Sequence, residues 1–172
     1  MRLTKDQATG FTLVELITVI LLLGILSAVA VARSGSSSDF EPRMFAANVA
    51  EQYGFAHGLS ASRYNDPVDF DVVASAGSWQ FISRSALTGE VRREEMTTDG
   101  LGITVQNGSS SLSLNAGNTL SIRFSPTGDI ASANLDGLPL QVELGIELQV
   151  AGDSMHQLCI YPTGYLRSDS CE

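Results

Sequence analysis

Residues 9–33 read TGFTLVELITVILLLGILSAVAVAR, and this stretch decides how the chain is organised. From Phe11 to Ala32 there are 22 residues, and Glu15 is the only charged one among them. A helix of that length, at 1.5 Å per residue, extends about 33 Å, enough to cross the roughly 30 Å hydrocarbon core of a bilayer. The run is longer than the apolar core of a secretory signal peptide. It therefore predicts a membrane-spanning helix over residues 11–32.

The charges on either side of the apolar run predict its orientation. Arg2 and Lys5, the only lysine of the chain, precede the run, whereas nearly all the acidic residues follow it. Basic residues are retained on the cytoplasmic side of a membrane. The sequence thus predicts a short cytoplasmic N-terminus over residues 1–10 and an extracytoplasmic domain over residues 33–172.

Glu15 needs a partner that the apolar run itself does not contain. A carboxylate in lipid must be protonated, paired, or facing a protein neighbour. Its partner therefore comes from another chain or from a newly made N-terminus. Cleavage after Gly10 would place a free amino group on Phe11, within reach of the Glu15 of an adjacent subunit.

Composition excludes some functions and predicts one covalent bond. The 172-residue chain has a net charge of −9 and a pI near 4.5, which argues against nucleic acid as a partner, because such binding depends on clustered Lys and Arg. Two cysteines, Cys159 and Cys171, lie near the C-terminus. An even count in a chain directed out of the cytoplasm indicates one disulfide. A metal site would need more ligands, and only His156 is close in sequence.

Beyond the apolar run, a break and a second helix are expected. Gly35 and the neighbouring serines disfavour a helix, so we expect a bend or hinge over residues 34–41, with a restart at Pro42. An amphipathic helix is predicted from Arg43 to about Arg63. Its apolar face is formed by residues at helical spacing, namely Phe45, Val49, Ala56 and Leu59 or Ser60. Gly54 and Gly58 are interpreted as points of close approach to a sheet.

After Pro67 the pattern changes to the alternation of strands. Val68, Phe70 and Val72 alternate with Asp69 and Asp71, which predicts a half-buried strand with its acids facing water. Further strands are expected at 79–82, 101–106, 111–114, 120–124 and 141–150, while Leu158, Ile160, Tyr165 and Leu166 lie near the expected disulfide. Residues 84–100 are interpreted as a link, with the charges of residues 90–95 on a solvated loop. Strands following one long helix predict an α+β fold.

Few residues offer catalytic or metal-binding chemistry. His57 and His156 are the only histidines, and no nucleophile elbow or zinc motif accompanies them, so we do not expect an enzyme. Asp66, Asp69 and Asp71 could supply oxygen ligands for Ca²⁺. Strand alternation already explains two of these acids, so we expect neither a metal nor a cofactor.

The stretch from Gly10 to Leu16, GFTLVEL, resembles the signature of type IV prepilins, which is also found in the pseudopilins of type II secretion. The resemblance covers the basic leader of residues 1–10, the Gly before the cut, the Phe after it and Glu15 at mature position five. It implies that a prepilin peptidase cuts between Gly10 and Phe11 and methylates the Phe11 amine. Many major pilins have a Pro at the position of Ala32, so its absence favours a minor subunit.

The same resemblance implies a pilin-like α+β fold, in which a long N-terminal helix packs on antiparallel sheet. The turns Phe124–Gly128 and Ile160–Gly164, each containing Pro-Thr-Gly, resemble those of H-type minor pseudopilins and FimT-like minor pilins. The loop from Cys159 to Cys171 resembles the C-terminal disulfide loop of minor pilins, including those of mannose-sensitive haemagglutinin (MSHA) pili.

The function implied is a minor subunit of a type IV pilus, with the MSHA-type pilus as the specific kind that the C-terminal loop suggests. The alternatives are an H-type minor pseudopilin of type II secretion, a FimT-like minor pilin for DNA uptake and, from a different class, a membrane-anchored sensor or enzyme that forms no filament. The implied location is the bacterial inner membrane, spanned once, and then the pilus or pseudopilus. The implied partners are other pilin or pseudopilin subunits, the prepilin peptidase, the inner-membrane assembly platform and, before assembly, membrane lipid.

Overall fold

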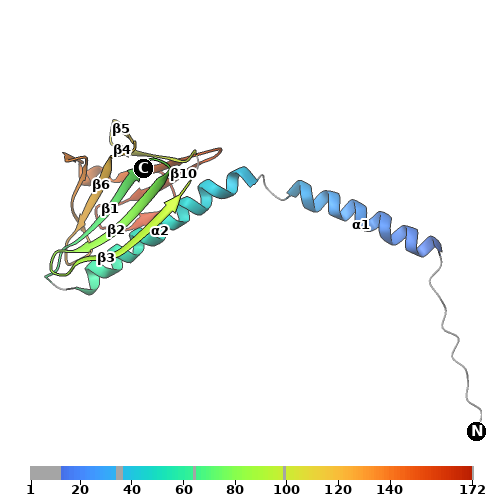
Figure 1. Cartoon of the computed structure of the whole chain (residues 1–172), viewed down its shortest axis with the longest axis horizontal. Helices are drawn as coiled ribbons and strands as arrows, with labels where there is room; N and C mark the ends of the chain where they lie inside the picture. Colours follow the sequence, from blue (N-terminus) through green and yellow to red (C-terminus); the bar gives the residue numbers. More distant parts are fainter. Residues whose placement is uncertain (1–12, 34–36, 64, 99, 172) are drawn as a thin grey trace, which may run out of the picture. The chain divides into compact units, whose positions relative to one another are not determined.

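The computed structural model of the chain describes residues 13–33, 37–63, 65–98 and 100–171 (Figure 1). The chain divides into two compact units, residues 1–36 and residues 37–172. In the first unit, helix α1 spans Leu13–Arg33. Its leucines and alanines are good helix formers. Glu15 lies in its first turn, where the helix dipole stabilises a negative charge by about 0.3–1 kcal/mol.

The second unit begins with helix α2, Ser37–Ser62, which includes Pro42 within it. The helix starts six residues earlier than predicted, so the interpretation of residues 37–41 as a break was wrong, while residues 34–36 lie outside the described part. Pro42 is buried, and the helix packs closely there, because a Cβ added to Gly152 would lie 2.8 Å from the Pro42 Cγ.

One face of α2 is buried in the core of the second unit. Five side chains at intervals of three or four residues are at most 1% exposed: Phe45, Val49, Tyr53, Ala56 and Ser60. The predicted face is confirmed, with Tyr53 added to it. The interpretation of Gly54 and Gly58 was wrong, since a Cβ at either position would meet nothing within 4 Å.

The strands form two antiparallel sheets. The first sheet has the order β3-β2-β1-β6-β7-β8. Its strands are β1 Val68–Ser75, β2 Ser78–Ser85, β3 Gly89–Thr97, β6 Thr119–Phe124, β7 Ile130–Leu135 and β8 Leu138–Pro139. The second sheet has the order β11-β10-β9-β4-β5. It contains β4 Gly102–Asn107, β5 Ser110–Leu114, β9 Ile146–Ala151, β10 Met155–Ile160 and β11 Leu166–Arg167. The α+β class is as predicted.

Both sheets and α2 share one hydrophobic core. The helix contacts β1 and β2 of the first sheet and β9 and β10 of the second. Phe45 of α2 lies 5.8 Å from Trp79 and 6.0 Å from Phe81, between ring centroids. Leu120 and Ile122 of the first sheet and Ile146 of the second are fully buried in the same cluster. The second unit therefore folds around a single core.

Strand β3 lies where the sequence predicted a loop. It pairs with β2 from Ser78 opposite Thr97 to Ser85 opposite Gly89. It is an edge strand of the first sheet. All the side chains of its sequence, GEVRREEMT, are exposed or half-buried, so the strand has no buried apolar face. Charged side chains on such an edge hinder pairing with other chains. The prediction that the charged residues 90–95 face solvent is confirmed, but the prediction that they form a loop was wrong.

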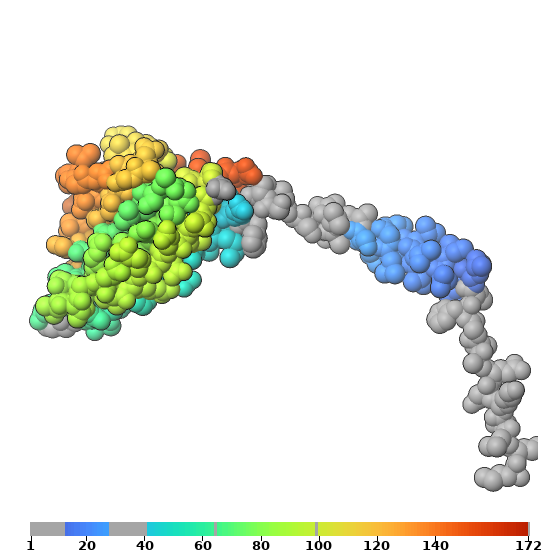
Figure 2. All heavy atoms as spheres, in the orientation of Figure 1, coloured from blue at the N-terminus to red at the C-terminus, as the bar shows by residue number. Residues whose placement is uncertain are grey.

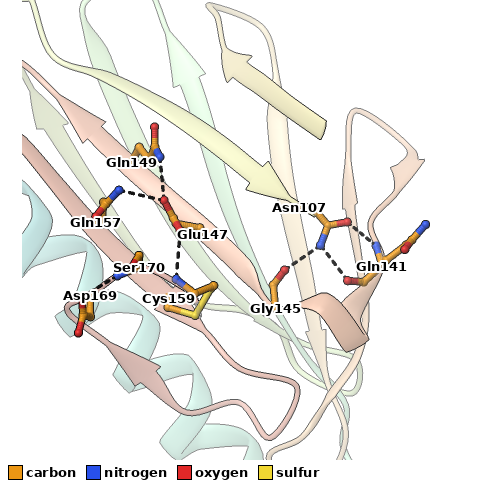
Figure 3. The surroundings of a disulfide bond; sticks show 10 residues. Asn107, Gln141, Gly145, Glu147, Gln149, Gln157, Cys159, Asp169 and Ser170 are labelled. Atoms are coloured by element: carbon orange, nitrogen blue, oxygen red, sulfur yellow. Dashed lines mark hydrogen bonds between the residues drawn. A yellow bond between two sulfur atoms is a disulfide. The ribbon is translucent and has the colours of Figure 1, made fainter. Parts of the chain in front are cut away.

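The region 141–150 is also different from the single strand expected. Residues Val142–Leu144 form a 3₁₀ turn, η1, and β9 starts only at Ile146. Gly145 has φ of +75°, which interrupts a strand and favours glycine. Asn107 holds the turn, donating from Nδ2 to the carbonyls of Gln141 (2.8 Å) and Gly145 (2.7 Å) (Figure 3). Strands β7 and β8 were not predicted.

Candidate functional site

The predicted processing site lies at the start of the first unit. Gly10 and Phe11 are outside the described residues, so their cleavage and methylation stay predictions. Glu15 is described, and its side chain is exposed in the first turn of α1. One turn further along, the Thr18 hydroxyl donates a 2.9 Å hydrogen bond to the Glu15 carbonyl oxygen, which satisfies part of the Thr18 polarity within the helix.

The surface of α1 is largely apolar, with Glu15 and Thr18 as its polar exceptions in the first two turns. Every side chain from Leu13 to Ser27 is exposed, and Figure 2 shows them in blue. The large apolar ones among them are 42–75% exposed. Burying one such side chain contributes about 1.5–3 kcal/mol, and a helix that is hydrophobic all round is normally buried in a large core or a membrane. The helix is therefore built to be covered by something beyond its own unit.

No helix among the described residues meets the length and apolarity needed to cross a membrane. The span predicted for residues 11–32 begins outside the described part and stays a prediction.

Comparison with protein families explains why Glu15 and the apolar helix occur together. Residues 6–31 match the prokaryotic N-terminal methylation motif. The chain carries the N-terminal motif of type IV pilin-like proteins. The motif implies processing by a prepilin peptidase and assembly with other pilin subunits. Comparison with curated proteins and with solved structures gives no match for the chain.

The second unit of this pilin-like protein brings its two Pro-Thr-Gly turns together. The Ser125–Gly128 turn joins β6 to β7 in the first sheet, and the Tyr161–Gly164 turn joins β10 to β11 in the second. The Ile130 amide donates a 2.9 Å hydrogen bond to the Pro162 carbonyl oxygen. A Cβ added to Gly164 would overlap the carbonyl oxygen of Gly128. The paired turns thus join one sheet to the other.

Two side chains of α2 cover the paired turns. The Tyr53 hydroxyl donates a 3.0 Å hydrogen bond to the Gly164 carbonyl oxygen. Burial raises the pKa of the Tyr53 hydroxyl well above its usual range, so it remains a donor at any ordinary pH. The His57 ring stacks on Tyr53, and its Nε2 would lie only 2.9 Å from a Cβ on Gly164. His57 is therefore a contact between helix and turns.

The C-terminal cysteines form a disulfide in the structure. Cys159 and Cys171 are bonded, with their Cα atoms 5.1 Å apart. Beside them, the buried carboxylate of Glu147 accepts a 3.0 Å hydrogen bond from the Cys171 amide (Figure 3). The loop from Cys159 to Cys171 is thus closed by a covalent bond and a polar contact.

The three aspartates considered for Ca²⁺ have other partners. Asp66 accepts hydrogen bonds from the Ser85 hydroxyl at 2.7 Å and the Leu87 amide at 3.1 Å. The Ser85 bond, above all, lowers the pKa of the Asp66 carboxyl, despite its burial. Within the described ranges, no group of three or more His, Cys, Asp or Glu side chains is arranged to hold a metal ion.

The two strand acids lie on the outer surface of the first sheet. Asp69 pairs with both Nε and Nη2 of Arg123, at 2.6 and 2.8 Å, and this pair raises the pKa of Arg123. Asp71 was expected to face water but is only 4% exposed. Arg84 and the Ser121 hydroxyl cover it with hydrogen bonds, because the neighbouring strands place both side chains beside it.

The second histidine lies on the β9–β10 hairpin. The His156 Nε2 is 3.2 Å from the Ser154 hydroxyl oxygen. A catalytic triad also needs an acid that orients the other ring nitrogen of the histidine. The contact between Ser154 and His156 provides a serine and a histidine alone.

The sequence interpretation missed two residues that organise this unit. Tyr53 continues the spacing of Phe45 and Val49 along α2, so helical periodicity could have identified it. Glu147 was assigned to the polar face of its strand, which is correct, but it is buried there with 7% exposure. Nothing local in the sequence indicates that the C-terminal residues cover it.

Proposed function

We propose that this pilin-like protein is a minor subunit of a type IV pilus. In this proposal, a prepilin peptidase cleaves between Gly10 and Phe11 and methylates the new Phe11 amine. The mature chain waits in the inner membrane, with residues 33–172 outside the cytoplasm, until the assembly platform adds it to the filament. Removing residues 1–10 takes away Arg2, Lys5 and Asp6, so the net charge changes from −9 to −10.

The observation that carries the proposal is the surface of α1. The helix is largely apolar and exposed on all sides, and it carries Glu15 in its first turn within the methylation motif. Lipid can cover such a surface before assembly, and the α1 helices of other subunits can cover it afterwards. The contribution of the helix dipole to Glu15, about 0.3–1 kcal/mol, is smaller than the roughly 2.5–3.5 kcal/mol cost of a charge deep in a bilayer. In the assembled filament, the proposal places the methylated Phe11 amine of a neighbouring subunit beside Glu15.

The proposal is tested first at the cleavage site. Replacing Gly10 by a bulky residue, Gly10→Val, is expected to abolish processing, so that an immunoblot detects only the precursor. Thr9→Val at the preceding position serves as the matched control and is expected to be processed. A mature-sized product from the Gly10 variant would contradict the assignment as a prepilin.

A second candidate is an H-type minor pseudopilin of a type II secretion system. Its support is the two Pro-Thr-Gly turns, which resemble those of H-type minor pseudopilins and of FimT-like minor pilins and form one contact site between the sheets in this chain. Deleting the gene separates the two. Loss of surface filaments with normal protein secretion supports the pilus subunit, and the opposite pattern supports the pseudopilin. Loss of DNA uptake alone would support the third option, which the acidic composition disfavours.

A further inference from the structure

Four side chains form a block on the outer face of the second sheet. Glu147 and Gln149 lie on β9, and Cys159 and Gln157 lie opposite them on β10. Directly opposed residues of antiparallel strands share one face of a sheet, so the Cys159 sulfur emerges beside the Glu147 carboxylate. Cys171, near the C-terminus, is joined to this block by its disulfide with Cys159, and Figure 3 shows Glu147, Gln149, Gln157 and Cys159 side by side.

Glu147 uses its two oxygens for different partners. Oε1 accepts hydrogen bonds from Nε2 of Gln149 at 2.7 Å and Nε2 of Gln157 at 3.2 Å. Oε2 accepts the backbone amide of Cys171 at 3.0 Å. The three donors are neutral, and Glu147 is 7% exposed. Burying a carboxylate among neutral groups is costly. We therefore expect the Glu147 carboxylate to have a role that needs a strong hydrogen-bond acceptor, and its bond to the Cys171 amide provides one.

We propose that Glu147 positions Cys171 for closure of the disulfide with Cys159. The hydrogen bond engages the backbone of Cys171 and leaves its sulfur free, so the same contact can form before the covalent bond exists. The two glutamine amides hold the carboxylate in place. Closing the loop between the two cysteines costs conformational entropy. If the hydrogen bond already holds Cys171 beside Cys159, less of this entropy is lost when the disulfide forms.

The chemical step is ordinary thiol–disulfide exchange, and Glu147 takes no electrons or protons in it. One thiolate of the pair attacks an external disulfide such as oxidised glutathione and forms a mixed disulfide. The second thiolate displaces glutathione from it. The two cysteines together lose two protons and two electrons, and one oxidised glutathione becomes two reduced molecules. Glu147 acts only by positioning.

The test uses the full chain, purified in a mild detergent and equilibrated in glutathione redox buffers. Thiol trapping gives the effective concentration of the two cysteines toward each other. Glu147→Leu is expected to lower it about tenfold, the equivalent of one lost hydrogen bond to a charged group. Glu147→Gln keeps an acceptor oxygen and is expected to lose clearly less. Glu143→Leu, at an exposed carboxylate of η1, is the matched control and is expected to change nothing.

An effective concentration in Glu147→Leu equal to that of the wild type overturns the proposal, and so does an equal loss in Glu147→Gln. If Glu147→Leu does not fold, the decision rests on the wild type. After reduction, the Cys171 amide is expected to keep its protection from hydrogen exchange, measured by NMR, at a level well above that of an unstructured chain. Loss of that protection on reduction would mean that the disulfide holds Cys171 in place, and the proposal would then be wrong.

Discussion

The Tyr53 hydroxyl of α2 donates a 3.0 Å hydrogen bond to the carbonyl oxygen of Gly164, 111 residues further along the chain. The contact is buried, and it ends on the turn that also receives the Ile130 amide at Pro162. One phenol therefore fixes the helix to the place where the two sheets meet. Residues far apart in the sequence are brought into a single structural unit by this contact.

Removing the hydroxyl leaves the Gly164 carbonyl buried without this donor. Tyr53→Phe is expected to lower the free energy of unfolding by about 1–2 kcal/mol. Urea unfolding can be followed by the fluorescence of Trp79, the only tryptophan, which is buried. Tyr165→Phe removes the same atom from a side chain that is 63% exposed, and it is expected to change stability by less than about 0.5 kcal/mol. Equal effects in both variants would contradict the role given to Tyr53.

Two glycines separate the effect of close packing from that of backbone strain. Gly164 and Gly137 have similar φ values, +74° and +80°, but only at Gly164 would a Cβ meet other atoms, those of Gly128 and His57. Gly137→Ala is expected to cost about 1 kcal/mol from strain alone. Gly164→Ala is expected to cost at least about 3 kcal/mol, since the turns must also move apart. Similar losses in the two variants would show that the turns are not tightly packed.

Acid is expected to weaken the second unit through Asp66. Its carboxyl has a lowered pKa in the folded state, chiefly because the Ser85 hydroxyl donates to it. In the acidic range the unfolded chain therefore binds more protons, and stability rises with pH. The contribution is complete above the unfolded pKa of about 3.9 and is lost as pH falls through the folded one.

The measurement is urea unfolding at a series of pH values from neutral downward. Asp66→Asn is expected to be less stable than the wild type at neutral pH and to lose less stability on acidification. Asp153→Asn, at an exposed position, is the control and should follow the wild-type curve. Parallel curves for the wild type and Asp66→Asn would contradict the expectation.

Glu15 is expected to matter for assembly and not for processing. Under the proposed function, Glu15→Ala is cleaved normally but enters filaments much less often, because the Phe11 amine of the neighbouring subunit loses its partner. Glu15→Gln should show the same defect, since it removes the charge and keeps the size. Immunoblots of sheared filaments and of whole cells give the incorporated fraction. Normal incorporation of both variants would contradict the proposed pairing of Glu15 with the Phe11 amine of a neighbouring subunit.

Strands with a regular apolar alternation could be predicted from the sequence. In β1 the fully buried Val68, Phe70 and Val72 alternate with the two acids, and the prediction of a strand there is confirmed. The alternation is visible because one face of the strand lies on the core. It gave no indication that Asp71 is covered, since Arg84 and Ser121 come from other strands.

The edge strand β3 and the split of region 141–150 could not be read in this way. In β3 the pairing with β2 decides the structure, and the charged side chains carry no period that distinguishes a strand from a loop. Before β9, the apolar Val142 and Leu144 continue the alternation in sequence. There, the hydrogen bonds of Asn107, more than thirty residues away, hold a turn instead.

In the candidate site, too, local features could be predicted from the sequence and long-range contacts could not. A local pattern was sufficient for the methylation motif, because leader, Glu15 and apolar helix are contiguous. The grouping of Tyr53 and His57 with two glycines depends on how the sheets meet, and a single sequence does not contain that information.

The junction of the two Pro-Thr-Gly turns has a mechanical consequence. A pull applied through α2 reaches the first sheet through its contacts with β1 and β2, and it reaches the second through β9, β10 and Tyr53. The hydrogen bond from Ile130 to Pro162 and the close approach of Gly164 to Gly128 both resist separation of the two sheets at this junction. Under tension, the domain should therefore give way in one step at high force, without first shedding one sheet, a property that suits a subunit of a fibre under load.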